Sequence, residues 1–132
     1  MSPVVGVGVD AVDVDRFRRV LGRRPGLPAR LFSQDERDDA ARAGDPAERL
    51  AARFAAKEAV MKALGSGIGS FALRDVEVVR APGDGPTSGA PSLRLAAGAA
   101  ELARRRGVSH WHVSLTHTAR TAVAMVVAEG DR

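Results

Sequence analysis

The feature that most constrains the fold is a long helix predicted between Asp45 and Gly65. Asp45 is a suitable N-cap, Pro46 fits the first helical position and Glu48 completes the start pattern. Gly65 is typical of the residue that ends a helix. Between these limits, apolar residues recur at helical spacing, at Leu50, Phe54, Met61 and Leu64. The length of 132 residues indicates a single domain, residues 1–132, around this helix.

The segment from Val4 to Asp10 is predicted to be a β-strand. Valines alternate with other residues, so Val5, Val7 and Val9 share one face. Gly6, Gly8 and Asp10 share the other face. The glycines remove side chains from the face of the aspartate, which leaves room either for a ligand or for a closely packed backbone.

The remaining elements are short and mixed in type. Asp13 is expected to cap a helix that ends at Gly22, with Val14, Phe17 and Leu21 on its core face, and Gly22–Pro28 is expected to be a loop. Ser33 and Glu36 form a capping-box pattern that begins a second helix. Further elements are a strand at 72–80, a turn region at 84–91, a short strand around 93–95, a helix at 96–106 and a hairpin of strands at 111–116 and 121–128.

The chain is basic, with a formal net charge of +4. A basic protein is expected to bind an anionic partner: nucleic acid, membrane, a phosphorylated ligand or an acidic protein. The arginines gather between Asp13 and Leu31 and at 104–106. Only four Phe and one Trp are available for stacking on bases, which weighs against nucleic acid.

Other absences in the sequence indicate a cytoplasmic protein. The chain has no Cys, so it has neither disulfides nor thiol chemistry. No stretch approaches the roughly 20 apolar residues of a membrane span, so no membrane association is expected. The N-terminal segment lacks a basic region and resembles a strand, so we predict no signal peptide.

The two lysines of the chain, Lys57 and Lys62, lie within one predicted helical turn. Glu58 and Lys62 are four residues apart and share a helix face, as do Arg53 and Lys57. A carboxylate with ammonium groups beside it suits a phosphate and its metal ion; a surface pair of little energetic consequence is the alternative. Lys57 interrupts the apolar stripe, which is unusual for a purely structural helix.

Three segments, in this order and spacing, resemble the holo-acyl-carrier-protein synthase family, the short type of 4′-phosphopantetheinyl transferase. They are Gly6–Asp10, Arg53–Ala59 with Lys62, and His112–Thr118. The resemblance extends from about Val4 to Glu129, and R-F-A-A-K-E-A followed by K-A-L-G-S-G-I is its most specific part. It implies an α+β fold with a small antiparallel sheet on a long central helix, and a trimer with sites at subunit boundaries. The valine-rich first strand and apolar last strand agree with a trimer.

The resemblance also implies a reaction. A serine of an apo acyl carrier protein attacks the β-phosphate of coenzyme A, the phosphopantetheine arm moves to the serine, and adenosine 3′,5′-bisphosphate leaves. Asp10 and Glu58 match the family's ligands for Mg²⁺, an ion that prefers carboxylates, waters and phosphates. Lys62 matches the lysine that faces the phosphates. Either Glu58 or a metal-held water is expected to take the serine proton, and the sequence leaves that choice open.

Two further sets of residues follow from the resemblance. Expected near coenzyme A are Arg53, Lys57, Lys62, Gly65, Ser66, Gly67, His117 and Thr118. Expected to dock the acidic carrier protein are Arg16, Arg23 and Arg30, with help from Arg19 and Arg24. His110 and His112 are expected to be strand residues with hydrogen-bond partners.

The sequence departs from the family pattern at two places, and two other functions remain open. Asp13 stands where the family often has Glu, and Gly89-Ala90-Pro91 lacks the usual lysine of this turn. The 81–92 loop is long for the family. A basic nucleic-acid-binding module predicts binding that weakens steeply with salt and needs no Mg²⁺. A catalytically idle trimeric scaffold predicts assembly without turnover.

Overall fold

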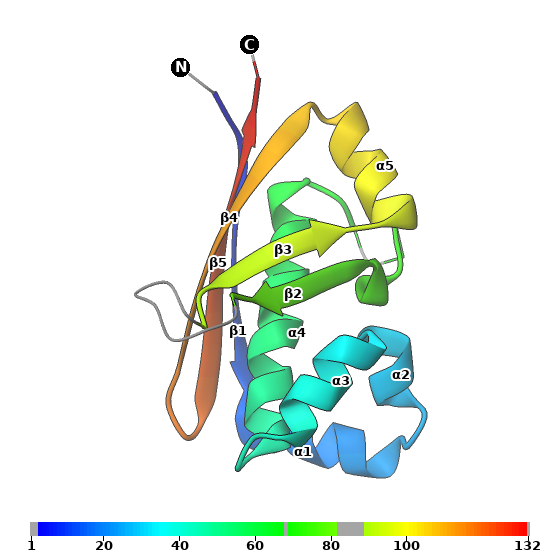
Figure 1. Cartoon of the computed structure of the whole chain (residues 1–132), viewed down its shortest axis with the longest axis vertical. Helices are drawn as coiled ribbons and strands as arrows, with labels where there is room; N and C mark the ends of the chain where they lie inside the picture. The colour runs from blue at the N-terminus through cyan, green and yellow to red at the C-terminus, as the bar shows by residue number, and fades with distance from the viewer. Residues whose placement is uncertain (1–2, 68, 82–88, 132) are drawn as a thin grey trace.

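A long helix packed against a three-stranded sheet forms the centre of the computed structural model, which describes residues 3–67, 69–81 and 89–131 (Figure 1). The strands are β1 (Val4–Asp13), β2 (Val76–Arg80), β3 (Pro91–Leu95), β4 (Val108–His117) and β5 (Thr121–Gly130). The helices are α1 (Val14–Arg23), α2 (Leu27–Leu31), α3 (Gln34–Ala41), α4 (Pro46–Ala63) and α5 (Ala97–Arg105), with a 3₁₀ turn, η1, at Leu73–Asp75. The predicted α+β class with one long central helix is confirmed.

The main sheet has the order β1-β5-β4, and all its pairings are antiparallel. Helix α4 covers one face of this sheet, and β2 and β3 form a separate antiparallel pair beside it (Figure 1). The inward side chains of β5 are small or β-branched and fully buried, namely Ala122, Ala124, Val126 and Ala128. Small residues on both surfaces let the helix approach the sheet closely.

Gly6 and Gly8 are required by this close approach. A Cβ at Gly6 would lie 1.8 Å from the carbonyl oxygen of Ala63, and one at Gly8 would lie 1.8 Å from that of Ala59. No side chain fits at either distance. Of the two alternatives drawn from the sequence, the closely packed backbone is therefore correct at these two positions.

The predicted helix caps are confirmed at all three positions. The Asp13 carboxylate accepts backbone N–H groups at the start of α1, Ser33 and Glu36 complete a capping box on α3, and Asp45 accepts from the backbone of Glu48 on α4. These caps fix where the polypeptide changes direction. They thereby determine that the end of β1 and the start of α1 border the middle of α4.

Several boundaries differ from the sequence-based prediction, and β3, β4 and β5 are each longer than predicted. The segment predicted as a loop through Pro28 contains the start of α2, a helix too short to show a periodic apolar pattern. Strand β1 continues to Asp13, past the predicted end at Asp10. The predicted strand at 72–80 begins with η1. Most of the 84–91 turn region, and most of the 81–92 loop, lies outside the described residues.

The outer face of the main sheet carries exposed apolar side chains. Val5 is 39% exposed, Val7 52%, Val9 51% and Met125 46%, all on the side of the sheet that α4 leaves uncovered. Adjacent exposed valines of this kind are typical of a surface that another protein covers. Among the described residues, no helix has the length and apolar character needed to cross a bilayer.

Candidate active site

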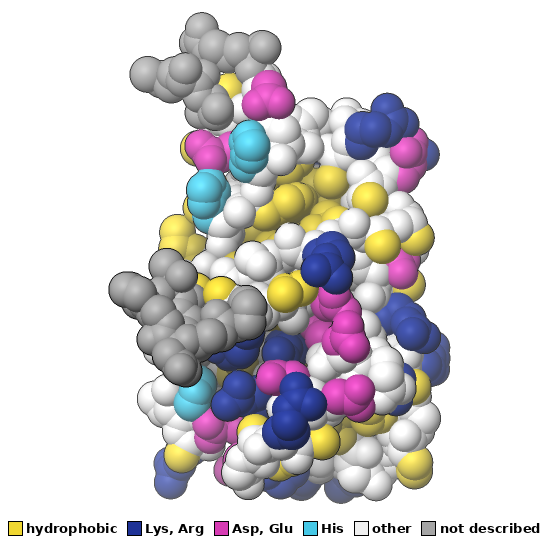
Figure 2. Space-filling view, viewed as in Figure 1, with side chains coloured by type: hydrophobic (Ala, Val, Ile, Leu, Met, Phe, Trp, Pro, Cys, Tyr) yellow, Lys and Arg dark blue, Asp and Glu magenta, His cyan; other side chains and the backbone are white. Residues whose placement is uncertain are grey.

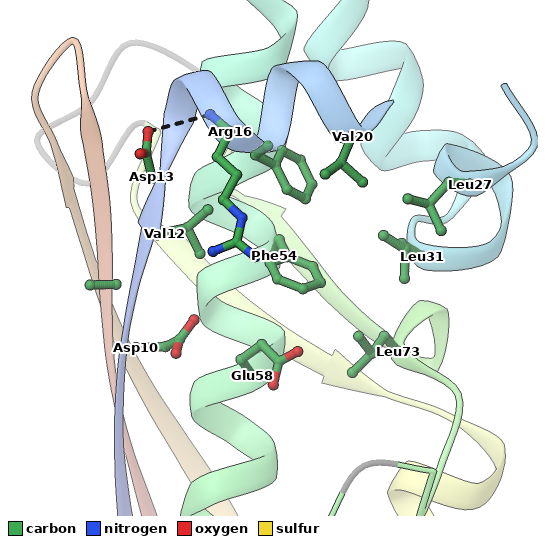
Figure 3. Close-up of a pocket in the computed structure, with 12 residues that line it drawn as sticks. Asp10, Val12, Asp13, Arg16, Val20, Leu27, Leu31, Phe54, Glu58 and Leu73 are labelled. Carbon is green, nitrogen blue, oxygen red and sulfur yellow. Dashed lines mark hydrogen bonds between the residues drawn. The ribbon is translucent and has the colours of Figure 1, made fainter. Parts of the chain in front are cut away.

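A cavity of about 580 Å³ lies between the end of β1, helices α1 and α2, and the middle of α4 (Figure 3). Its walls are mainly apolar and come from Val12, Phe17, Val20, Leu27, Leu31, Phe54 and Leu73. Four charged residues border it: Asp10, Asp13, Arg16 and Glu58. An apolar hollow with a few convergent charged groups is a typical binding site for a small molecule.

Asp10 and Glu58 meet at one side of this cavity, although they are distant in the sequence. Asp10 projects from β1 and Glu58 from α4, and both carboxylates point into the same space (Figure 3). Burial raises the pKa of Glu58, the negative charge of Asp10 raises it further, and Lys62 opposes both effects. Two like charges held this close favour a shared cation or proton.

Lys62 completes the group from the next turn of α4. Its ammonium donates to Asp10 Oδ1 at 3.1 Å and to the carbonyl oxygen of Val9 at 2.9 Å. The Lys62 side chain is 55% exposed and that of Asp10 is 17% exposed. A flexible, half-exposed ammonium beside two carboxylates is free to turn toward an incoming phosphate.

The paired carboxylates fit a hard divalent cation. Mg²⁺ is usually bound by one or two carboxylates, with waters and substrate phosphates in its other positions. Asp10 and Glu58 supply that number, and a cation between them would offset the repulsion that raises the Glu58 pKa. Within residues 3–67, 69–81 and 89–131, no cluster of three or more His, Cys, Asp or Glu side chains is arranged to hold a metal ion by protein ligands alone.

Arg53 and Lys57 lie on a different face of α4 and do not line this cavity. Lys57 is fully buried and pairs with Glu36 at 2.7 Å. Arg53 is 2% exposed and donates to Asp39 at 2.8 Å. The structure therefore does not bring Lys57 to the site where sequence reasoning placed it, because α3 and η1 cover this face of the helix.

Arg53 instead borders a second polar region near the start of α4. It lines a cavity of about 210 Å³ with Arg80, and Arg80 also lines a neighbouring cavity of about 280 Å³ with Arg49 and His117. Two nitrogens of Arg53, Nε and Nη1, have no hydrogen-bond partner among the described residues. His117 Nδ1 lies 3.0 Å from a Glu48 oxygen. The lining is mixed in charge, since Asp39 and Glu77 border the first cavity and Asp45 and Glu48 the second, but the unpartnered arginine nitrogens are donors that an anion can use.

The group of Asp10, Glu58 and Lys62 and the region around Arg53 and His117 are well separated on one chain. Glu48, which contacts His117, and Glu58 are ten residues apart on α4, or about 15 Å along a helix axis. A ligand that touched both regions of one chain would have to be extended. Sequence reasoning missed Arg80 because it lies on β2, remote from Arg53 in the sequence. Arg49 precedes Arg53 by four residues on α4 and so shares its face, a signal that was present in the sequence.

The glycine-rich segment after α4 lines two further hollows. Gly65 has a φ of +64°, which favours glycine, and lies beside Lys62 in a hollow of about 250 Å³. Ser66 and Gly67 line a separate cavity of about 450 Å³ against α5. Thr118 closes the β4–β5 turn, where its hydroxyl accepts the backbone N–H groups of residues 120 and 121.

Of the arginines on the first two helices, Arg16 borders the main cavity. Arg16 lines the cavity and extends toward Phe54 (Figure 3). Arg23 is in the last turn of α1, and Arg30 is in the last turn of α2, both exposed. His110 and His112 on β4 face acidic partners, Asp131 just after β5 and Glu129 on β5, as strand residues with partners were expected to do.

Comparison with known proteins identifies the family. A model of the 4′-phosphopantetheinyl transferase superfamily matches residues 6–127. The chain belongs to this superfamily. This chain is 54% identical to the holo-[acyl-carrier-protein] synthase of Frankia casuarinae, an alignment that covers 96% of this chain and 98% of the relative. It is 50% identical to the synthase of Clavibacter michiganensis, with 96% of both chains covered.

Solved structures of phosphopantetheinyl transferases share the fold. The holo-[acyl-carrier-protein] synthase of Neisseria meningitidis superimposes with a TM-score of 0.83 at 29% identity, over 96% of this chain and 98% of that one. The synthase of Bacillus anthracis, solved in complex with CoA (3′,5′-ADP), gives a TM-score of 0.77 at 30% identity, over 99% of this chain and all of that one. The family predicted from the three motifs is thereby confirmed.

Proposed function

We propose that this chain transfers the 4′-phosphopantetheine arm of coenzyme A to a serine of an apo acyl carrier protein. The observation that carries the proposal is the meeting of Asp10 and Glu58 in one cavity, with Lys62 beside them, in a chain of this superfamily. Transfer of a phosphoryl-type group depends mainly on positioning and on neutralisation of charge. Asp10, Glu58 and Lys62 supply both the positioning and the charge, and they are carried by two rigid elements, strand β1 and helix α4.

Asp10 and Glu58 are the residues that would hold Mg²⁺. The ion, when bound, would neutralise the charge that develops on the diphosphate of the donor. The serine oxygen forms a bond to the β-phosphorus, and the bond from that phosphorus to the bridging oxygen of the diphosphate breaks. Adenosine 3′,5′-bisphosphate leaves with the electron pair of that bond. We assign the serine proton to Glu58, whose side chain lines the cavity beside Asp10.

Lys62 assists the leaving group. Its ammonium already lies between β1 and the cavity, 3.1 Å from Asp10. An ammonium is a compact charge that can turn from a carboxylate to a phosphate oxygen with little change in position. Loss of this charge would leave the departing diphosphate oxygen without a protein partner.

The donor's other phosphates are assigned to two places, the glycine-rich segment after α4 and the region around Arg53 and His117. Gly65 shares a hollow with Lys62 and Arg106, and Ser66 and Gly67 line the neighbouring cavity with Arg105 and Arg106. Arg53 lines one of the two neighbouring cavities that share Arg80, and His117 lines the other. Thr118 directly follows His117 in the sequence. The separation along α4 is explained if the second region of one subunit serves the site of another.

A homotrimer provides that arrangement. The exposed face of β1 and β5 offers Val5, Val7, Val9 and Met125 to a second copy of the chain, and burial of such a surface favours association. Measurement of mass in solution by light scattering tests this part of the proposal. A monomer at micromolar concentration would contradict it.

The carrier protein is assigned to the arginines of α1 and α2. Arg16, Arg23 and Arg30 lie on α1 and α2, and an acidic surface would be oriented by their charge. The carrier serine would then reach the space between Asp10 and Glu58.

The test is the mass of the carrier. Incubation with coenzyme A, Mg²⁺ and an apo carrier should add about 340 Da, the mass of the arm transferred in a phosphoryl reaction of this kind. The gain should depend on Mg²⁺ and be absent with Asp10→Asn. Unchanged mass across carriers from fatty-acid, polyketide and peptide synthesis would overturn the proposal.

A further inference from the structure

Lys57 and Glu36 form a buried ion pair behind the candidate active site. Lys57 Nζ lies 2.7 Å from Glu36 Oε1, and the two side chains are 0% and 1% exposed. The same ammonium donates to the carbonyl oxygen of Leu73 at 3.1 Å and to that of Val76. An ammonium has three donors, so this one is saturated by the protein itself.

Glu36 is saturated in the same way. Its Oε1 also accepts the backbone N–H of Ser33 at 2.9 Å, and its Oε2 accepts that of Val78 at 3.0 Å. The Lys57 ammonium lies 5.3 Å from the centre of the Phe32 ring, which adds a cation–π contact. The pair therefore joins the start of α3, the middle of α4, and the segment from η1 to β2.

This network is connected to the lining of the cavity through two residues, Glu58 and Leu73. Lys57 directly precedes Glu58 in α4, so the buried ammonium and the site carboxylate are carried by one helical turn. Leu73, whose carbonyl Lys57 binds, lines the same cavity as Glu58 (Figure 3). The hydrogen bond from Lys57 to Leu73 therefore ties one wall of the cavity to the helix that carries the carboxylate.

A buried ion pair is not needed to fill this space. Desolvation of two charges largely cancels their attraction, and apolar side chains of similar volume often give equal or greater stability. Apolar residues cannot form the directional bonds to the backbone of Leu73, Val76 and Val78. The specific contribution of the pair is therefore the fixed placement of η1 and β2 against α4.

We propose that the Glu36–Lys57 pair is a positioning device for the transfer reaction. It holds the spacing between Glu58 and the Leu73 wall, and so the orientation of the donor against the carboxylates. Lys57 is thus a positioning residue that touches neither substrate nor metal. This inference rests on the proposed function, because it names how that site is held in shape.

The test separates positioning from stability. The double variant Glu36→Leu/Lys57→Met removes both charges together, and Glu36→Gln keeps the shape of the side chain but leaves the Lys57 charge without its partner. Val113→Ala, a partly buried core change on β4, is the control for a loss of packing away from this network. Each protein is assayed well below its own melting temperature.

Both pair variants should lose about tenfold or more in kcat at saturating coenzyme A, since small displacements at a reacting centre have effects of this size. The dissociation constant for coenzyme A, measured by calorimetry, should change less than about threefold, because the phosphate-binding groups are untouched. Val113→Ala should keep the wild-type kcat. If the pair variants lose no more kcat than Val113→Ala does, the inference is overturned.

A second measurement does not depend on turnover. The ¹³C carboxyl resonance of Glu58 should shift in both pair variants and stay in place in Val113→Ala. An unchanged resonance in the pair variants would contradict positioning. A wild-type protein that fails to modify any carrier would overturn the proposed function instead, and the Glu58 resonance would still test whether the pair shapes the site.

Discussion

Helix α4 presents two faces with the same local pattern and opposite surroundings. Arg53 and Lys57 are four residues apart on one face, and Glu58 and Lys62 on another. The first face is buried under α3 and η1 and its charges are paired internally, whereas the second face opens to a cavity. The comparison teaches that identical spacing along a helix gives a structural anchor or a reactive site depending on what covers it.

The largest difference between the two faces should be the loss of stability when each lysine is replaced. Lys57→Met leaves Glu36 buried without its partner and should cost about 3–5 kcal/mol in the free energy of unfolding. Lys62→Met removes a half-exposed pair and should change that free energy by less than about 1 kcal/mol. Urea unfolding of both variants measures the difference. Equal losses would show that the two faces do not differ as described.

The glycines of β1 should be nearly as sensitive as the buried lysine. Gly8→Ala places a Cβ 1.8 Å from the carbonyl oxygen of Ala59, so β1 and α4 have to separate. We expect a loss of about 3 kcal/mol in the free energy of unfolding, measured by thermal or urea denaturation. Gly22→Ala is the matched control, because nothing lies within 4 Å of its added Cβ. A tolerated Gly8→Ala would contradict the close packing.

Substitution of the two carboxylates at the cavity should reduce activity strongly and change stability little. Asp10→Asn and Glu58→Gln should each reduce carrier modification at least about a hundredfold, since each removes a charge that supports the reacting group. Circular dichroism should show folded proteins in both cases. A variant with more than about a tenth of wild-type activity would remove that residue from the mechanism.

The raised pKa of Glu58 gives a pH dependence with a definite sign. Because burial and the Asp10 charge raise the pKa above the ordinary value of 4.5, the folded state binds more protons than the unfolded state. The contribution of Glu58 to stability is thus greatest below pH 4.5 and is lost as pH rises through the folded-state pKa. Glu58→Gln should therefore stabilise the protein at pH 7 relative to wild type.

Melting temperatures across pH test this sign. The advantage of Glu58→Gln over wild type should diminish as the pH falls through the folded-state pKa of Glu58 toward 4.5, and should change no further below that pH. An advantage that persisted unchanged into acid would show that the substitution acts by packing and not by charge. A destabilised Glu58→Gln at pH 7 would contradict the raised pKa.

The exposed arginines should have the smallest effect. Arg23→Ala or Arg30→Ala should raise the KM for an acidic carrier by a few-fold and leave the KM for coenzyme A unchanged, because exposed charges act mainly on encounter. Added salt should reduce the difference between variant and wild type. Steady-state kinetics at two salt concentrations provides the measurement. A change confined to coenzyme A would assign these arginines to the donor.

The sequence predicted much of the fold, and it picked out the face of α4 that borders the cavity. Helix starts are local, so Asp13, Ser33 and Asp45 were identifiable as caps from their immediate neighbours. Asp10 and Glu58 came from motif resemblance, and the structure brings both to one cavity. Spacing along a helix identifies which residues share a face.

The buried face was not predictable in the same way. What covers Lys57 comes from α3 and from η1, segments that are remote from it in the sequence. The acidic partner, Glu36, was identified only as a capping residue, and its second function depends on tertiary packing. Helix α2 was missed because five residues show no helical period.

The central claim is that Asp10 and Glu58 together hold a divalent ion against the diphosphate of the donor. Mn²⁺, a paramagnetic substitute for Mg²⁺, tests it when added to the ¹³C-labelled protein with coenzyme A. We predict that substoichiometric Mn²⁺ broadens the carboxyl resonances of Asp10 and Glu58 first, and that Asp10→Asn weakens the effect on Glu58. Broadening that begins at other carboxylates and spares these two would contradict the claim.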